Sequence, residues 1–226
     1  MKHIKILSLG NHSSHSSQSY LPKLAKSDSA VIVAGALYAA DVNLSDIVKS
    51  AEENSEVFTF VCNSEDSVRF DVSENFSVSR ALDWLDWDYV VIQQSDELSS
   101  DENTYFPYLT KLCEIIKANC RKATVIIAEP LLAESKSACE YAVKNSDAVM
   151  YLPVGTVFAS AEKAGLCKRG DVDSQFGRIS EFISACVWYE MITGNNVSLN
   201  KYRLPFVESR ITAEIKNLVH NSLSNA

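Results

Sequence analysis

The chain has 226 residues, of which 46% are hydrophobic, and a net charge of -8 from 29 acidic and 21 basic side chains. This length and composition predict a single domain, residues 1–226, with a sizeable buried core. Because no cluster of Lys and Arg stands out, we expect neither nucleic acid nor an anionic membrane as a partner. No apolar run approaches the length of a transmembrane helix.

Cysteine usage and the start of the chain bear on the compartment. Six cysteines are present, none in a C-x-x-C pair, and most lie in apolar runs. This pattern indicates reduced core thiols rather than a disulfide framework. The first predicted strand begins almost at Met1, so we expect no secretion signal and a cytoplasmic location. A periplasmic or secreted location stays open if the natural chain carries a further leader.

Strand-like and helix-like segments alternate along the chain. Short apolar runs indicate buried strands, and apolar residues at i, i+3, i+4 and i+7 indicate amphipathic helices. In chain order, the pattern predicts a strand at 4–9, a polar loop at 12–17, a helix around 20–24, a strand at 30–34, a helix at 44–53, weaker strands at 57–62 and 67–72, a helix at 81–85, a strand at 89–93, a helix at 106–118, strands at 124–128 and 150–153, and helices near 179–187 and 211–219.

This alternation predicts an α/β fold with three layers, in which helices cover both faces of a mainly parallel sheet. In such sheets, ligands bind beyond the carboxyl ends of the strands. The polar residues at those ends are therefore the candidates for a functional site. They lie at 10–11, 93–95, 129–130 and 153–155.

Four segments resemble the SGNH/GDSL hydrolases, in particular an uncharacterised branch common in Bacteroidetes. Residues 7–14 (LSLGNHSS) resemble its opening block, and residues 87–95 (WDYVVIQQS) resemble its central strand. Residues 152–156 (LPVGT) and 177–194 are similar to two later blocks. The resemblance implies a flavodoxin-like SGNH-hydrolase fold with a five-stranded, mainly parallel sheet. It also implies ester hydrolysis without a metal or cofactor.

The resemblance fails at the residues that would carry the chemistry. The family needs a serine directly after the first strand and a histidine in a D-x-x-H segment that takes the serine's proton. Here His12 stands at the position of the nucleophile. The D-x-x-H segment begins at Asp171, and Ser174 stands where the histidine belongs. Losing either partner typically reduces the rate by about 10⁴-fold or more.

Alternatives remain for the polar loop after the first strand. Ser14 could act as a relocated nucleophile with His12 or His15 as its base, although neighbouring side chains on a loop rarely reach the required angle. The two histidines could also bind a metal together with Asp171 or Asp173, but two His at this spacing are weak evidence. The simplest interpretation is a solvated loop whose serines cap the next helix. We therefore predict no metal site.

The leading hypothesis is an SGNH-like protein with impaired catalysis that binds a small acyl-derived or carbohydrate-derived molecule. The predicted cleft is lined by His12 and by the candidate ligand contacts Asn11, Gln93, Gln94 and Asp173. Gln93 and Gln94 fit either a polar floor for a ligand or ordinary turn hydrogen bonding. One alternative is an active esterase with rearranged catalytic groups. Another is a structural or interaction protein. The sequence gives no oligomeric state.

Overall fold

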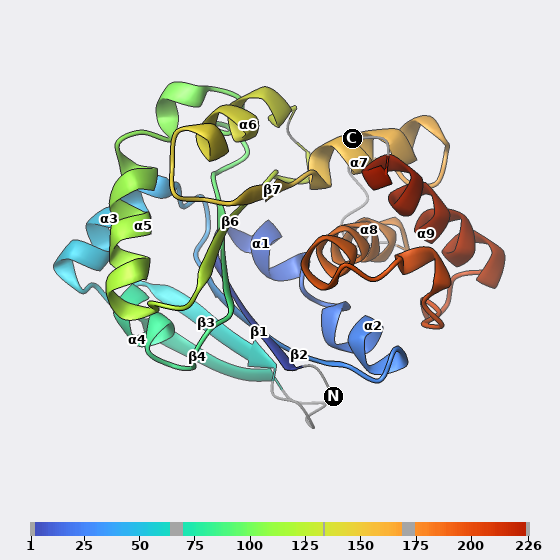
Figure 1. The fold of residues 1–226 in the computed structure, drawn as a ribbon, viewed down its shortest axis with the longest axis horizontal. Helices are drawn as coiled ribbons and strands as arrows, with labels where there is room; N and C mark the ends of the chain where they lie inside the picture. The colour runs from blue at the N-terminus through green and yellow to red at the C-terminus, as the bar shows by residue number, and fades with distance from the viewer. Residues whose placement is uncertain (1–2, 64–69, 133, 169–174, 225–226) are drawn as a thin grey trace.

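The computed structural model describes residues 3–63, 70–132, 134–168 and 175–224, and its centre is one sheet (Figure 1). Seven strands form this sheet in the order β4-β3-β2-β1-β5-β6-β7. The first strand of the chain lies at the middle of the sheet. The strands are β1 (His3–Gly10), β2 (Val31–Tyr38), β3 (Phe58–Asn63), β4 (Phe70–Phe76), β5 (Tyr89–Gln93), β6 (Thr124–Ala128) and β7 (Met150–Leu152).

The sheet is mixed, and this corrects the predicted strand count. Five strands, β2-β1-β5-β6-β7, run parallel. They follow the chain order 2-1-3-4-5 that is typical of flavodoxin-like folds. The other two, β3 and β4, extend one edge as an antiparallel pair beside β2. The weak strand candidate at 57–62 corresponds to β3, and the candidate at 67–72 overlaps β4 at residues 70–72, whereas residues 67–69 lie outside the described residues. Among the described residues the sheet has seven strands rather than five.

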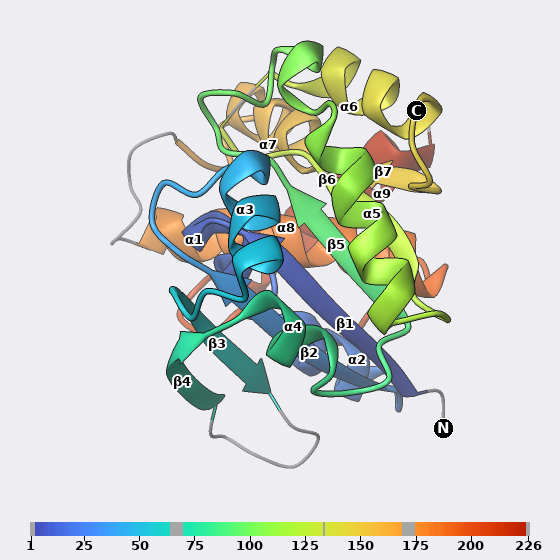
Figure 2. The same ribbon diagram turned by 90° about the vertical axis from the view of Figure 1, so that its left-hand side faces the viewer.

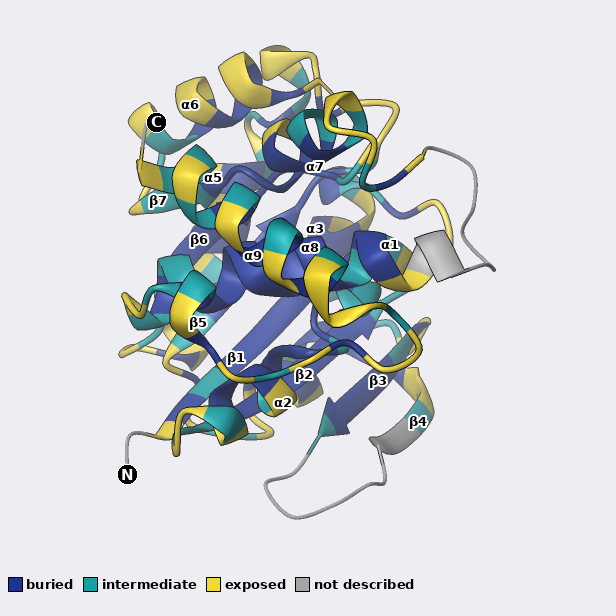
Figure 3. Cartoon of the chain, turned by 90° about the vertical axis from the view of Figure 1, so that its right-hand side faces the viewer, coloured by how far each residue is buried: buried dark blue, intermediate teal, exposed yellow. Residues whose placement is uncertain are grey.

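Helices cover both faces of the sheet, as the alternation predicts. Figure 2 shows α3, α4 and α5 in front of the sheet, and Figure 3 shows α8 and α9 on the opposite side, with the largely buried α8 behind α9 and the exposed face of α9 turned outward. The helices are α1 (His12–Ser16), α2 (Leu21–Ser27), α3 (Leu44–Glu53), α4 (Val78–Leu82), α5 (Tyr108–Asn119), α6 (Lys136–Lys144), α7 (Val154–Lys163), α8 (Gln175–Thr193) and α9 (Ser209–Ser224), with short 3₁₀ turns η1 (Glu102–Thr104) and η2 (Val197–Leu199).

Each face has its own hydrophobic core. One core joins the sheet to α3, α4, α5 and α6, and the other joins it to α2, α7, α8 and α9. Successive residues of β1 alternate between the two, so that Ile6 packs under α8 whereas Leu7 packs under α3. This alternation follows from the two-residue period of a strand. In the part of the chain that the structure describes, no helix is both long and apolar enough to cross a bilayer.

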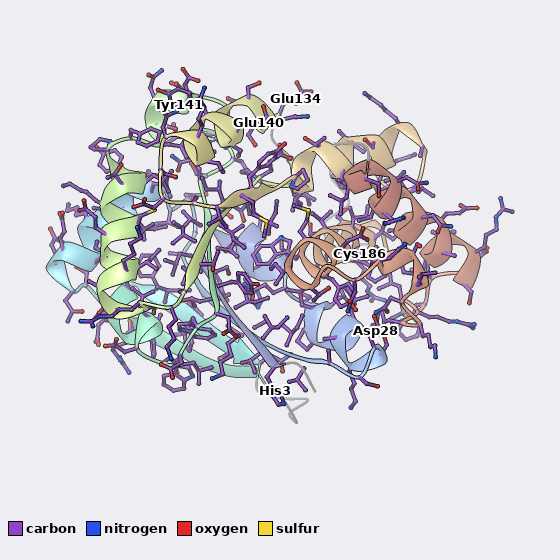
Figure 4. All side chains as sticks on the ribbon, viewed as in Figure 1. His3, Asp28, Glu134, Glu140, Tyr141 and Cys186 are labelled. Atoms are coloured by element: carbon purple, nitrogen blue, oxygen red, sulfur yellow. The ribbon has the colours of Figure 1, made fainter. Side chains whose placement is uncertain are left out.

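The prediction of buried core cysteines is confirmed, since all six are buried and none forms a disulfide within the described residues. Figure 4 shows Cys186 inside the layer that α8 and α9 form. Burial raises the pKa of the thiols of Cys113, Cys120 and Cys139 to about 11. These thiols therefore stay protonated at neutral pH and pack as small apolar groups.

Four segments differ clearly from the predicted elements. The polar loop at 12–17 is largely the short helix α1. Two helices, α6 and α7, were not predicted, and both have mostly small or β-branched residues on their buried faces. The second strand, β2, continues four residues beyond the predicted end at Ala34 and finishes at Tyr38. This extension brings Tyr38 to the carboxyl edge of the sheet, beside the end of β1.

Candidate functional site

The candidate site begins where β1 ends at Gly10. A methyl group added to Gly10 would lie 3.1 Å from Gln93 Cβ, 3.2 Å from Gln93 O and 3.3 Å from Ser14 Cβ. These distances are shorter than nine in ten Cβ contacts, so any side chain here would push β5 or the start of α1 away by a few tenths of an ångström, whereas glycine allows the close approach. The close approach brings residues about 80 positions apart into one site.

Asn11 starts α1 as its N-cap. Its Oδ1 accepts hydrogen bonds from Ser13 N at 3.0 Å and from Ser13 Oγ at 2.7 Å. An N-cap of this kind satisfies backbone N–H groups that have no partner within the helix. The cap explains why a run of Ser and His residues, which are poor helix formers, nevertheless turns into a helix.

A hydroxyl group links the two strand ends. Gln93 Nε2 donates to Ser13 Oγ at 2.6 Å, and Ser13 Oγ in turn donates to Asn11 Oδ1. Gln93 is 2% exposed, whereas Asn11 and Ser13 are half-buried. The Ser13 hydroxyl thus donates its hydrogen bond to a neutral amide oxygen, which is not a base. An amide in this place orients the hydroxyl but does not activate it as a nucleophile.

Ser14, the relocated nucleophile considered above, is fully buried. Its hydroxyl donates to Asn11 O at 2.8 Å. Among the described residues, no imidazole forms a hydrogen bond with this hydroxyl. The pairing of Ser14 with His12 or His15 is therefore not formed in this structure. A hydroxyl that satisfies the backbone inside the first turn is a structural group.

The imidazoles of α1 pack against each other and against Tyr38. The His15 ring stacks on the Tyr38 ring with centroids 4.9 Å apart, and the exposed His12 ring meets both rings edge-on at 5.8 Å and 5.4 Å. Burial, and next the neighbouring His12, lower the pKa of His15. His15 is therefore neutral at pH 7. The cluster forms an aromatic wall beside the Asn11 cap.

Gln94 lies one residue further along but faces different partners. Its Oε1 accepts from Leu44 N at 3.1 Å and from Ser95 N at 3.0 Å. Its Nε2 donates to the backbone and hydroxyl oxygens of Thr104 at 3.1 and 3.2 Å. The side chain is 1% exposed and ties the start of α3 to η1. This placement favours a structural role over the predicted ligand contact, because a ligand would have to displace one of these bonds.

One part of the predicted cleft, the segment from Asp171 to Ser174, cannot be placed. Asp171, Asp173 and Ser174 lie outside the described residues. Across the ranges that are described, no group of three or more His, Cys, Asp or Glu side chains gathers at one point as a metal ion would require.

A buried glutamate, which the sequence did not single out as a site residue, follows β6. Glu129 is 1% exposed, and its two oxygens accept from Thr156 N at 2.8 Å and from Thr156 Oγ1 at 3.1 Å. Glu129 therefore caps the N-terminus of α7, although it lies 27 positions before Thr156 in the sequence. Burial is the largest influence on its carboxyl group and raises its pKa, against the opposing hydrogen bonds from Thr156. The only sequence signal for it was its place at a strand end.

The comparison with known families decides what kind of chain this is. A family model described as a domain of unknown function, DUF4886, matches residues 5–151, more than half of the chain. The chain belongs to the DUF4886 family. Among proteins with curated descriptions, none matches it.

Two solved structures place this DUF4886 chain among known folds. It is similar to a DUF4886 family protein from Bacteroides uniformis, with a TM-score of 0.88 and 19% identity over 99% of this chain and 95% of that one. It is also similar to a proposed SGNH hydrolase from Slackia heliotrinireducens, with a TM-score of 0.53 and 19% identity over 84% of this chain and all of the other. At these identities the likeness establishes the fold. The α/β architecture similar to an SGNH hydrolase is thereby confirmed.

The residues that form the site of the DUF4886 chain differ in part from the predicted ones. The structure joins Asn11 and Gln93 through Ser13 at the carboxyl edge, and His12 follows Asn11 as the first residue of α1. It adds Ser13 as the link between the strand ends and Tyr38 as the support of the imidazoles. Tyr38 escaped the sequence analysis because the second strand was predicted to stop too early.

Proposed function

We propose that this chain binds a small ligand at the carboxyl edge of its sheet and does not hydrolyse esters by a serine mechanism. The observation that carries the proposal is the way the hydroxyls at the head of α1 are used. Ser13 Oγ is held between two side-chain amides and Ser14 Oγ is bonded to backbone. By the resemblance of residues 7–14, the imidazole of His12 stands where SGNH hydrolases carry their nucleophilic serine. A hydroxyl does lie near this imidazole, since Ser16 Oγ is 3.5 Å from His12 Nδ1, but this exposed contact is longer than the roughly 2.6–3.2 Å of a nucleophile–base pair. The described groups therefore provide no proton relay for acyl transfer.

The remaining groups suit binding. Within the described residues, Asn11 Nδ2 and Gln93 Oε1 make no hydrogen bond, which leaves a donor on the half-buried Asn11 and an acceptor on the buried Gln93. The described hydrogen bonds and ion pairs of these residues involve neither Lys nor Arg. A polar but uncharged site of this kind suits a small neutral molecule, such as a sugar or an acyl amide, better than a phosphate or carboxylate.

The hydrolysis half of the proposal is tested with p-nitrophenyl acetate. We expect the wild-type chain to release p-nitrophenol no faster than a matched concentration of the Ser13→Ala or Ser14→Ala variant. The comparison among variants separates a serine mechanism from slow acetylation of surface groups. Turnover by the wild-type chain that either alanine variant abolishes would establish an active esterase with rearranged groups.

The binding half is tested by thermal shift with glucose, N-acetylglucosamine and butyramide as probes. A ligand at about 100 times its Kd stabilises the folded state by about 2.7 kcal/mol, which raises the Tm of a chain of this size by about 5 °C or more. We expect such a shift with at least one probe, its loss in Gln93→Ala, and its retention in Lys122→Ala, a change on the exposed turn before β6. No shift with any probe would favour a structural or interaction protein instead.

A further inference from the structure

A small cavity lies beneath His15, between the α1–α2 turn and the sheet. It is lined by Ala34 and Ala36 of β2, by Val61 and Asn63 of β3, and by His15, Gln18 and Ser19. The two alanines leave the space open because their side chains are short. The cavity volume, about 10 Å³ for a water-sized sphere, is close to the smallest that holds one water molecule.

Two of the residues that line this cavity carry a buried nitrogen without a hydrogen-bond partner. His15 Nδ1 and Gln18 Nε2 are both buried and have no hydrogen-bond partner among the described residues. Gln18 itself is only 5% exposed. Buried polar atoms are nearly always bonded to protein or to ordered water, since an unpaired one costs about 1–3 kcal/mol. Two such atoms on residues that line one cavity indicate a shared partner inside it.

The chemistry of the two nitrogens selects the occupant. Gln18 Nε2 is a donor only, so the occupant must accept a hydrogen bond. His15 is neutral at pH 7, because burial and then His12 lower its pKa. A neutral pocket of this size does not offset the charge of an anion, and an amide nitrogen does not ligate a cation. Water fits, because it accepts from Gln18 and donates to the lone pair of His15 Nδ1.

We propose that this cavity is a specific site for one water molecule, which bridges Gln18 Nε2 and His15 Nδ1 and fixes His15 in the tautomer that carries its proton on Nε2. Of the two ring nitrogens of His15, only Nδ1 is both buried and without a partner. In the proposed bridge the water donates to Nδ1, so the proton sits on the nitrogen that does not face the cavity. Gln18 is a positioning residue for the imidazole stacked on Tyr38. The inference goes beyond the proposed function and stands whether or not a ligand binds.

The tautomer is read directly by long-range ¹H–¹⁵N NMR of His15 at about pH 7.5. We expect the wild-type chain to show the Nε2-protonated form. Gln18→Leu fills the cavity with methyl groups, removes the bridge and is expected to lower the tautomer ratio by about five-fold, the equivalent of one ordinary hydrogen bond. Gln18→Asn keeps an amide in reach of a water and is expected to retain the wild-type form. Ser19→Ala, another lining residue, is the matched control and should change nothing.

The result that overturns the proposal is equally direct. A wild-type His15 that carries its proton on Nδ1 would require an acceptor in the cavity and would exclude the bridge as drawn. An unchanged tautomer in folded Gln18→Leu would remove Gln18 from the argument. If Gln18→Leu does not fold, the wild-type spectrum, the Gln18→Asn spectrum and electron density for a water within hydrogen-bond distance of both nitrogens decide the question, and a crystal structure without that density refutes it.

Discussion

Replacing Glu129 tests how much its buried side chain stabilises the edge of the sheet at which the parallel strands end. Glu129→Ala removes the acceptor for Thr156 N and Thr156 Oγ1. Leaving a buried donor unsatisfied costs about 1–3 kcal/mol, and the lost side-chain volume adds a cavity term. We expect a total loss of about 3–5 kcal/mol in the free energy of unfolding. Glu129→Gln keeps one acceptor oxygen and should lose about 1 kcal/mol.

The difference in unfolding free energy between the wild-type chain and Glu129→Gln depends on pH, and the sign of that dependence can be worked out. Burial raises the pKa of Glu129 above its ordinary value of 4.5, so the folded state binds the proton more tightly than the unfolded state does. The contribution of Glu129 to stability is therefore full below pH 4.5 and decreases as the pH rises through the folded-state pKa. Each tenfold difference in proton affinity corresponds to about 1.4 kcal/mol. Glu129→Gln does not titrate and lacks this decrease.

Urea unfolding followed by circular dichroism, at several pH values between about 4 and 8, measures both effects. Thr156→Val serves as the control, because it removes only the hydroxyl and leaves the backbone donor to Glu129. We expect the advantage of the wild-type chain over Glu129→Gln to shrink as the pH rises. If that advantage grew with pH, the hydrogen bonds from α7 would outweigh burial and the reasoning would be wrong.

Three further changes probe the head of α1. Gly10→Ala places a methyl group 3.1 Å from Gln93 Cβ, so we expect a loss of about 1–3 kcal/mol in urea unfolding; a neutral effect would refute the close approach. Asn11→Ala removes the N-cap and should cost about 1 kcal/mol, whereas Asn11→Asp should cost less, as measured by thermal unfolding. Because burial lowers the pKa of His15 below 6.5, the wild-type chain should lose stability as the pH falls below about 6.5; His15→Gln should reduce this loss, and an identical pH profile would contradict it.

The sequence predicted the parallel core of the sheet because buried parallel strands are nearly continuous apolar runs. Residues 89–93 and 124–128 were predicted as strands and are β5 and β6 with the same bounds. The helices α6 and α7 were harder to predict from the sequence. Their buried positions include Ala138, Cys139 and Gly155, whose small side chains contrast little in hydrophobicity with the exposed positions. The short helix α1 was read as a loop because its stability comes from the Asn11 cap rather than from helix propensity.

The rule of strand ends predicts where the candidate site lies, but the hydrogen bonding among its residues was not foreseeable. Gln93 and Gln94 are neighbours with the same side chain, and the sequence left their roles equal. In the structure Gln93 reaches Ser13, whereas Gln94 reaches Leu44 and Thr104. Side chains that follow one another near the end of a strand leave it in different directions, and only the packed loops decide which partner each one meets.

The position of β1 has a consequence for how the chain is synthesised. His3–Gly10 pairs on one side with β2, but on its other side Ile6 faces Tyr89 and Leu9 faces Ile92. A ribosome that has released the first strand must therefore extend the chain by more than 80 residues before that strand is enclosed. During this interval an apolar strand has one bare edge, which is the condition in which nascent chains associate wrongly or recruit chaperones.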